Sequence, residues 1–219
     1  MTFMLTGNNV VTILKKVVVD FKGHSDQLRQ LDAVIGDGDL GVTVELGSKA
    51  LAEYLETVVE DDIGQLLVQC GLRFNKASPS TFGTLLASAF MGAGKIVAGK
   101  KVVHFQDLGP VADAAVEAIR KRGKADVGDK TMLDCLVPSV AAFKKLMADD
   151  AGLEAALQGA LKAAEDGMKA TIPMMARHGR ASWHRENTIG VQDAGATAMY
   201  YLIESFVRHL ITGYADEPS

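Results

Sequence analysis

The chain has 219 residues, of which 48% are hydrophobic and 23% are charged, and this balance excludes a disordered or fibrous protein. A chain of this length buries enough surface to fold without a metal ion or disulfide bonds. Its net charge of −4 supplies no positive field for a phosphate backbone, so we expect no nucleic-acid partner.

The apolar residues recur every three or four positions along most of the chain, which is the period of an α-helix. Only five prolines occur in the sequence, and we therefore predict an all-α fold. In the first helix an apolar stripe runs from Val10 to Phe21, and Asn8 or Asn9 is the candidate cap. About eight helices are expected, at residues 10–21, 43–59, 61–73, 81–98, 107–120, 131–146, 153–177 and 193–211.

A weak alternation of apolar and polar residues, the mark of a strand, occurs at residues 101–105. Because the chain contains no Pro/Ser-rich linker, low-complexity segment or internal repeat, we predict a single domain over residues 1–219. Polar connections that contain glycine or serine occur at residues 36–41, 75–80, 122–130 and 178–192. Loops an even number of helices apart share one end of an up-and-down bundle, so several of these connections are expected to converge.

The two cysteines, Cys70 and Cys135, lie far apart in the sequence, which argues against a zinc ribbon or a disulfide framework and fits a reducing compartment. The longest uncharged run, residues 77–94, contains five serine and threonine residues and is too polar to face lipid. The first six residues carry no positive charge and no signal-cleavage pattern. We therefore expect a cytoplasmic protein that does not associate with a membrane.

Three carboxylates, Asp32, Asp37 and Asp39, fall within eight residues and are separated by Gly36 and Gly38. Like charges at such spacing repel one another unless their pKa values rise or a cation lies between them. Oxygen ligands favour a hard cation, and Mg²⁺ held by a few carboxylates completes its shell with water and substrate phosphates. The cluster therefore predicts a magnesium site that serves a nucleotide. The alternative is a solvated acidic turn that caps the following helix.

Two nucleotide-binding motifs are matched only in part. Residues 36–41 have the spacing G-x-G-x-x-G, but no strand precedes them, and two aspartates there would repel a pyrophosphate. Residues 94–101 approach a Walker A loop, but Lys101 replaces the Ser or Thr that would hold Mg²⁺. If an EF-hand loop began at Asp37, Gly41 and Ser48 would occupy its fifth and twelfth positions, which must supply ligands to the ion. The sequence therefore does not fit this motif. We therefore exclude the dinucleotide fingerprint and the EF-hand, and residues 94–101 are better interpreted as a helix C-terminus that ends at Gly99 and is complemented by lysines.

Two later segments each allow two interpretations. Residues 128–134, Gly-Asp-Lys-Thr-Met-Leu-Asp, indicate a helix capped near Asp129 or Thr131, which is either an anion site made of free backbone N–H groups or simply a capping box. Residues 177–185 gather three arginines, two histidines and the only tryptophan. They form either a phosphate-neutralising segment or a solvated loop whose Trp183 packs against the bundle.

Taken together, these elements resemble the nucleotide-binding L subunit of dihydroxyacetone kinase. Four motifs of that family occur in order: L-D-x-x-I-G-D-x-D-x-G at residues 31–41, G-D-K-T-M at 128–132, G-R-A-S at 179–182 and I-G-x-Q-D-x-G-A-T at 189–197. They extend over nearly the whole chain. The resemblance implies an antiparallel eight-helix barrel that binds a nucleotide at one end.

The same resemblance implies which residues form the site. Asp32, Asp37 and Asp39 would be the catalytic residues and hold two Mg²⁺ ions that bridge the phosphates of ADP or ATP. The residues expected around the nucleotide are Leu40, Gly41, Thr43, Ala77, Ser78, Met132, Arg180, Asp193, Ala194 and Gly195. Two segments depart from the family pattern: residues 40–43 read Leu-Gly-Val-Thr in place of His-Gly-x-Asn, and residues 75–79 read Asn-Lys-Ala-Ser-Pro in place of Gly-Gly-Ala-Ser-Gly.

In the family the sugar is held covalently by a histidine of a separate K subunit. The resemblance therefore implies a kinase subunit for dihydroxyacetone or a related short keto sugar, active only with that partner. The phosphate would come from ATP directly or from a phosphocarrier protein that recharges bound ADP. The alternatives are a non-catalytic helical regulator or lipid-carrying module with the same fold, and a metal-dependent phosphatase that acts alone.

Overall fold

The computed structural model describes residues 3–215 of the chain. Within this range it has nine α-helices, one 3₁₀ helix (η1) and two short strands. In chain order they are β1 (Met4–Thr6), α1 (Gly7–Gly23), α2 (Ser25–Ile35), α3 (Asp39–Thr57), α4 (Ile63–Ala77), α5 (Thr81–Ile96), β2 (Val102–His104), α6 (Phe105–Gly123), α7 (Met132–Ala148), α8 (Leu153–Ala170), η1 (Arg180–Thr188) and α9 (Ala194–Ala215). The all-α prediction is confirmed.

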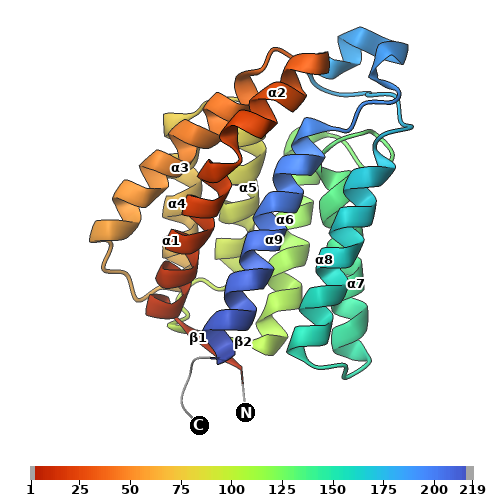
Figure 1. The fold of residues 1–219 in the computed structure, drawn as a ribbon. Helices are drawn as coiled ribbons and strands as arrows, with labels where there is room; N and C mark the ends of the chain where they lie inside the picture. The colour runs from red at the N-terminus through yellow and green to blue at the C-terminus, as the bar shows by residue number, and fades with distance from the viewer. Residues whose placement is uncertain (1–2, 216–219) are drawn as a thin grey trace.

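The long helices lie side by side and run alternately up and down, as Figure 1 shows. At the end of the bundle where both termini lie, β1 pairs antiparallel with β2, with Leu5 opposite Val103. The weak strand signal at residues 101–105 is therefore confirmed. The segment η1 lies at the opposite end, beside the connection between α2 and α3.

The structure differs from the sequence-based prediction in one helix, α2, which was not expected, and in the residue that caps α1. Helix α2 has only 11 residues and buries only Leu28, Ile35 and a serine, so it offers few core positions from which to predict it. The structure thus has nine α-helices where about eight were expected. The cap of α1 is Thr6 rather than an asparagine, because the Thr6 hydroxyl accepts from the Asn9 N–H while the Asn9 side chain accepts from the Thr6 N–H.

Several helix boundaries differ by a few residues from those expected, and two of the differences have a clear physical cause. Helix α3 begins at Asp39, four residues before the predicted start, because Gly38 adopts a positive φ of 73° and turns the chain into the helix. Helix α8 ends at Ala170, although the apolar pattern continues to residue 177. Pro173 has no N–H to donate to the helical ladder, and the chain leaves the helix just before it.

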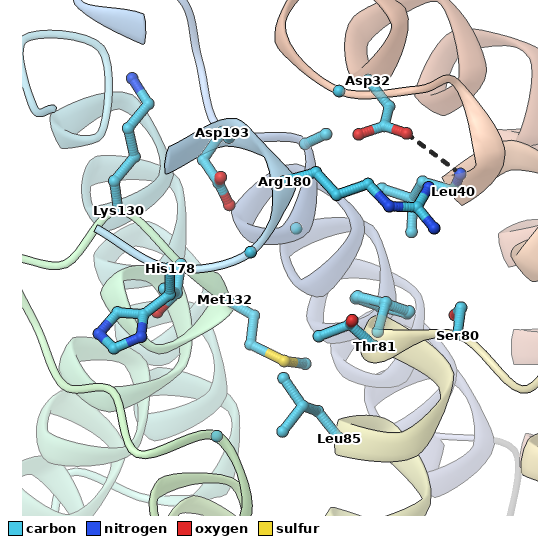
Figure 2. Close-up of a pocket in the computed structure, with 18 of the residues that line it drawn as sticks. Asp32, Leu40, Ser80, Thr81, Leu85, Lys130, Met132, His178, Arg180 and Asp193 are labelled. Carbon is cyan, nitrogen blue, oxygen red and sulfur yellow. Dashed lines mark hydrogen bonds between the residues drawn. The ribbon is translucent and has the colours of Figure 1, made fainter. Parts of the chain in front are cut away.

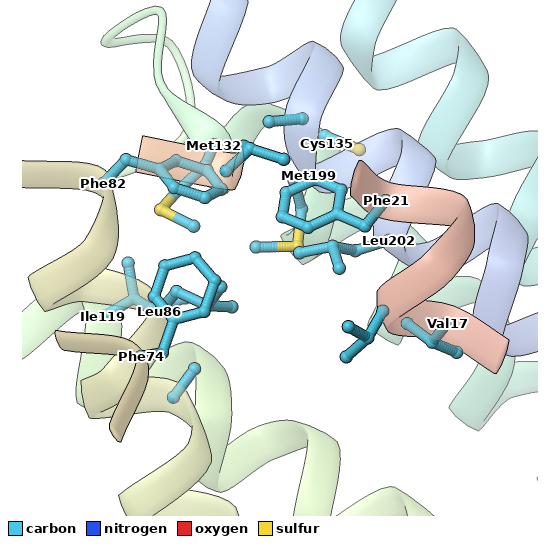
Figure 3. Close-up of a cluster of buried hydrophobic side chains, with 14 of the residues drawn as sticks. Val17, Phe21, Phe74, Phe82, Leu86, Ile119, Met132, Cys135, Met199 and Leu202 are labelled. Carbon is cyan, nitrogen blue, oxygen red and sulfur yellow. The ribbon is translucent and has the colours of Figure 1, made fainter. Parts of the chain in front are cut away.

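The centre of the bundle is filled by buried side chains from α1, α4, α5, α7 and α9, several of them aromatic or sulfur-containing (Figure 3). Phe21, Phe74, Phe82 and Met199 are among them. Both cysteines are buried free thiols, as expected, and burial raises the pKa of Cys70 to about 12. Among the residues described, we find no helix long and apolar enough to span a membrane.

Candidate functional site

Four connections meet at the end of the bundle opposite the termini and enclose a cavity of about 330 Å³. Its lining comes from residues 32–40, 79–85, 119–133, 178–181 and 193–195. These stretches include parts of all four polar connections found in the sequence, so their predicted convergence is confirmed. The alternating direction of the helices explains it, since each of these connections joins helices at the same end.

The three aspartates line one wall of this cavity. Asp32 is in the last turn of α2, Asp37 is in the two-glycine connection, and Asp39 is the first residue of α3. One carboxylate oxygen of each lies within 4.8 Å of the others. Gly36 is required for this approach, because a Cβ at that position would overlap the Asp32 carboxylate.

Positive partners partly offset the repulsion among these carboxylates. Asp32 Oδ2 accepts the backbone N–H of Leu40 at 3.3 Å, which places the charge at the positive N-terminal end of α3. Burial and the neighbouring Asp32 charge raise the pKa of Asp39. Arg180, the first residue of η1, extends toward the acidic wall, where Figure 2 shows it near Asp32 and Leu40. It forms ion pairs with Asp37 and with Asp39, the latter at 3.0 Å. The cluster thus lies at the start of the following helix, as the acidic-turn alternative has it, and Arg180 in addition ties it to a distant segment.

The opposite wall and the floor of the cavity are largely apolar. Figure 2 shows Leu85 of α5 and Met132 of α7 facing each other below the acidic wall, and Ile119 of α6 also contributes. The N-terminus of α9 closes one side, where Asp193 Oδ2 accepts the N–H of Ala196 at 2.7 Å. The cavity therefore has a charged half and an apolar half.

Asp193 is a half-buried acid in the lining of the cavity. Burial raises its pKa to about 7, although the Ala196 hydrogen bond and the positive charge of Lys130 act in the opposite direction. The charges of Asp134 and Asp32 raise it further. The charge of Asp193 therefore changes near neutral pH.

Most residues expected from the sequence meet at the cavity. Those that line it are Asp32, Asp37, Asp39, Leu40, Met132, Arg180, Asp193, Ala194 and Gly195. Gly41, Thr43, Ala77 and Ser78 are not among the lining residues. A Cβ at Gly41 would lie 2.6 Å from Arg29 Cβ, so this glycine permits the close packing of α3 on α2. The Ser78 hydroxyl is buried and donates to the Phe74 carbonyl at 2.9 Å.

The sequence reasoning did not assign several lining residues to the site. Leu85 and Ile119 belong to the apolar faces of α5 and α6, and helical spacing alone does not separate a pocket wall from a core. Pro79, Ser80 and Thr81 lie at the start of α5, immediately after the residues that were expected. Lys130 and His178 belong to the 128–134 and 177–185 segments, but the sequence alone predicts no role in binding for either residue.

The start of α7 is a capping box rather than an open anion site. Thr131 caps the helix, and the N–H groups of Gly128 and Thr131 both donate to the buried Asp134 carboxylate, at 2.6 and 2.7 Å. These donors already have a partner within the chain. Asp129 instead faces the 177–185 segment and pairs with Arg177 and His178, each at 3.3 Å.

Trp183 is 80% exposed, so the prediction that it packs against the bundle is wrong. Its segment folds as the 3₁₀ helix η1, which has few apolar residues to bury. Only the first residue of η1, Arg180, reaches the acidic wall. The arginine-rich segment is therefore divided in function: Arg180 belongs to the cavity, and the tryptophan points to solvent.

The fold and the site together define an all-helical domain with an acidic pocket at one end. Residues 34–208 match the DAK2 domain family. The chain is 30% identical to the "PEP-dependent dihydroxyacetone kinase, ADP-binding subunit DhaL" of Escherichia coli K12, covering 91% of this chain and 95% of that one. It is 32% identical to the corresponding subunit of the second such kinase of Listeria innocua, over 84% and 86% of the two chains. The chain belongs to the DAK2 domain family and is DhaL-like over most of its length.

The fold itself has a solved counterpart. The crystal structure of the dihydroxyacetone kinase from C. freundii in complex with AMP-PNP and Mg²⁺ superposes with a TM-score of 0.70 at 24% identity. The match covers 95% of this chain but only 35% of that one. The helical bundle is thus the fold of one part of a longer kinase chain.

Proposed function

We propose that the chain is the Mg-nucleotide-binding subunit of a kinase for dihydroxyacetone or a related short keto sugar. The observation that carries the proposal is the cluster of Asp32, Asp37 and Asp39 on the wall of a nucleotide-sized cavity. The names of the DhaL relatives, which describe ADP-binding subunits of dihydroxyacetone kinases, support the same conclusion.

The donor set fits magnesium. Three carboxylates whose oxygens lie within 4.8 Å of one another offer the hard, negatively charged ligands that this ion prefers. Asp32, Asp37 and Asp39 would hold two Mg²⁺ ions and thereby be the catalytic residues of the subunit. The bound metal would neutralise the charge on the phosphate oxygens of ADP or ATP, which is the main requirement of phosphoryl transfer.

Other residues of the cavity would bind the remaining parts of the nucleotide. Arg180, now paired with the aspartates, carries the positive charge nearest to them and would contact the phosphates. The apolar wall made by Leu85, Ile119 and Met132 would accept the base. The turn of Asp193, Ala194 and Gly195 would lie against the nucleotide at the N-terminus of α9. Leu40 would border the phosphates, with Gly41, Thr43, Ala77 and Ser78 supporting the wall from behind.

The sugar would be held by a separate K subunit, and the two chains would complete one active site. This part of the proposal rests on the word "subunit" in the names of the relatives and on the position of the cavity at one open end of the bundle. The phosphate donor would be either ATP or a phosphocarrier protein that recharges bound ADP. The complex would act in the cytoplasm.

The packing of the bundle argues against the lipid-carrying alternative. A lipid carrier needs an open apolar interior, whereas buried side chains such as Phe21, Phe74 and Leu202 occupy the centre of this bundle (Figure 3). The regulator alternative makes a different prediction from the kinase proposal, because it requires no binding of Mg-nucleotide.

Calorimetric titration with ADP in the presence and absence of Mg²⁺ tests the proposal. We expect Mg²⁺-dependent binding by the wild type, and Asp37→Asn is expected to weaken it by about 100-fold, since even residues that only support metal ligands contribute about 10–100-fold. Asp113→Asn, which removes an acid of the same kind paired with Lys144 on the surface, is the matched control and should bind like the wild type. Absence of wild-type binding, or equal affinity of the two variants, would refute the proposal.

A further inference from the structure

One lysine of this end of the bundle is almost fully buried. Lys130, in the connection between α6 and α7, is 2% exposed. Its side chain points away from the centre of the cavity (Figure 2). A lysine ammonium is rarely buried without compensation, so its partners indicate what it does.

The ammonium lies among four backbone carbonyl oxygens. Lys130 Nζ donates to the carbonyls of Thr171 at 2.9 Å, Met174 at 3.1 Å, Thr188 at 2.7 Å and Val191 at 2.5 Å. Three N–H protons are thus shared among four acceptors, all of them from one stretch of chain. Burial lowers the pKa of Lys130, whereas the nearby charges of Asp193 and Asp134 raise it.

These four carbonyls belong to the two ends of the segment that carries Arg180. Thr171 and Met174 follow the end of α8, and Thr188 and Val191 precede the start of α9. One charged group therefore holds both ends of the 171–191 segment together. Hydrogen bonds to a charged donor are roughly twice as strong as neutral ones, so the ammonium is the strongest single link at this point.

Neutral hydrogen bonds close the same segment around the lysine. The Gly190 N–H donates to the Ile172 carbonyl at 2.8 Å, and the Ala176 N–H donates to Thr188 Oγ1 at 3.0 Å. The segment is therefore a closed loop with its two ends at Lys130. Arg180 extends from this loop to Asp39, and η1 also lies against α2.

We propose that Lys130 is a positioning residue for the nucleotide site: by gathering the four carbonyls, it fixes the 171–191 loop so that Arg180 reaches the acidic wall. The role of Arg180 in binding phosphate rests on the proposed function, whereas the attachment of the loop to Lys130 does not. Lys130 acts through Arg180 and does not itself touch the nucleotide.

Hydrogen exchange followed by mass spectrometry, without nucleotide or metal, tests the attachment. In Lys130→Met the four carbonyls lose their charged donor, and we expect the amides of residues 172–191 to exchange about tenfold faster or more than in the wild type. Lys121→Met, which removes an exposed lysine of α6, is the matched control and should leave the exchange unchanged. Unchanged exchange in a folded Lys130→Met protein would overturn the proposal.

A double-mutant cycle tests whether Lys130 acts through Arg180. We expect Lys130→Met and Arg180→Gln each to weaken Mg-ADP binding by about tenfold, and the double variant to bind about as weakly as either single one. If the losses multiply to about 100-fold, the two residues act independently and Lys130 has no positioning role.

Hydrogen exchange and Mg-ADP binding together distinguish a failure of the loop attachment from a failure of the proposed function. If Lys130→Met does not fold, Lys130→Gln takes its place, since its amide still donates two hydrogen bonds but carries no charge. If the wild type binds no Mg-ADP, the proposed function and the positioning role both fall. The exchange experiment then still decides whether Lys130 holds the loop.

Discussion

Two charges of opposite sign, the buried Lys130 and the half-buried Asp193, belong to the lining of the cavity, and they differ in their hydrogen-bond partners. Lys130 has four carbonyl partners, whereas Asp193 accepts a hydrogen bond from the Ala196 N–H at the start of α9. A carboxylate with one such partner remains poorly solvated, which is why burial raises the pKa of Asp193 to about 7. Asp193 thus couples the stability of the fold to pH.

The pH dependence of stability tests this residue. An unfolded Asp has a pKa of about 3.9, so the folded protein binds the proton more tightly. The resulting stabilisation is complete below pH about 4 and is lost as the pH rises through about 7, an effect of up to about 4 kcal/mol. Asp193→Asn keeps the helix cap but cannot bind or release this proton. Between pH 4 and 7 we therefore expect its free energy of unfolding to fall less than that of the wild type.

Urea unfolding at several pH values, with EDTA present to keep the acidic cluster free of metal, measures this difference. Asp113→Asn, on the surface, serves as the control and should follow the wild-type curve. Parallel curves for wild type and Asp193→Asn would show that this acid has an ordinary pKa.

At the scale of elements, close helix packing depends on particular glycines. At the contact between α4 and α5, a Cβ on Gly64 would overlap the Gly94 carbonyl oxygen and lie 2.6 Å from the Cα of Ala98. These obstacles are backbone atoms, so the strain cannot be relieved by a side-chain rotation. The two helices would have to move apart.

Gly64→Ala is therefore expected to lower the free energy of unfolding by about 1–3 kcal/mol, the usual range for an overpacked core. This corresponds to a fall in Tm of roughly 2–4 °C per kcal/mol for a chain of this size. Gly213→Ala in α9 meets open space and gains about 0.5–1 kcal/mol of helix propensity, so its Tm should rise slightly. Thermal unfolding of both variants decides the question, and a Gly64→Ala protein as stable as the wild type would contradict the packing described.

The apolar pattern of the sequence predicts all of the α-helices of the described structure except α2. Helix α1 has a wide apolar stripe from Val10 to Phe21, and this stripe is sufficient to predict the helix from the sequence. Helix α2 buries little, and its existence depends on packing against α3, which Gly41 permits. The end of α8 was placed too late because apolar residues continue into the loop that surrounds Lys130.

The candidate site could be predicted to the extent that its residues are neighbours in sequence. The acidic cluster is a local feature, and its three members are found together in the structure. The apolar wall is not local, since Leu85 and Ile119 come from two helices whose other apolar residues form the core. The role of Lys130 depends on contacts with residues more than 40 positions away, and no spacing rule reveals these.

At the scale of the whole molecule, the alternation of the helices separates two ends with different properties. The termini and the β1–β2 pair occupy one end, and the cavity with η1 occupies the other (Figure 1). The proposed sugar-holding partner would approach the second end, because Asp32, Asp37 and Asp39 line the cavity there.

We therefore expect the isolated chain to transfer no phosphate from ATP, or from a phosphocarrier protein, to dihydroxyacetone. Addition of a purified K subunit should raise the rate by about 100-fold or more, because correct placement of two reactants lowers the barrier strongly. A coupled assay of dihydroxyacetone phosphate measures this, with Asp37→Asn plus the K subunit as the control for contaminating kinases. Equal turnover with and without the K subunit would contradict the two-subunit account.

The most direct test of the central claim is a crystal structure of the protein with ADP and Mn²⁺, an ion that shares the oxygen ligands of Mg²⁺ and scatters anomalously. The account predicts anomalous peaks among the carboxylates of Asp32, Asp37 and Asp39, with the diphosphate on the far side of the metal and Arg180 turned toward it. A nucleotide bound elsewhere, or an acidic cluster that holds no manganese at saturating concentration, would contradict it.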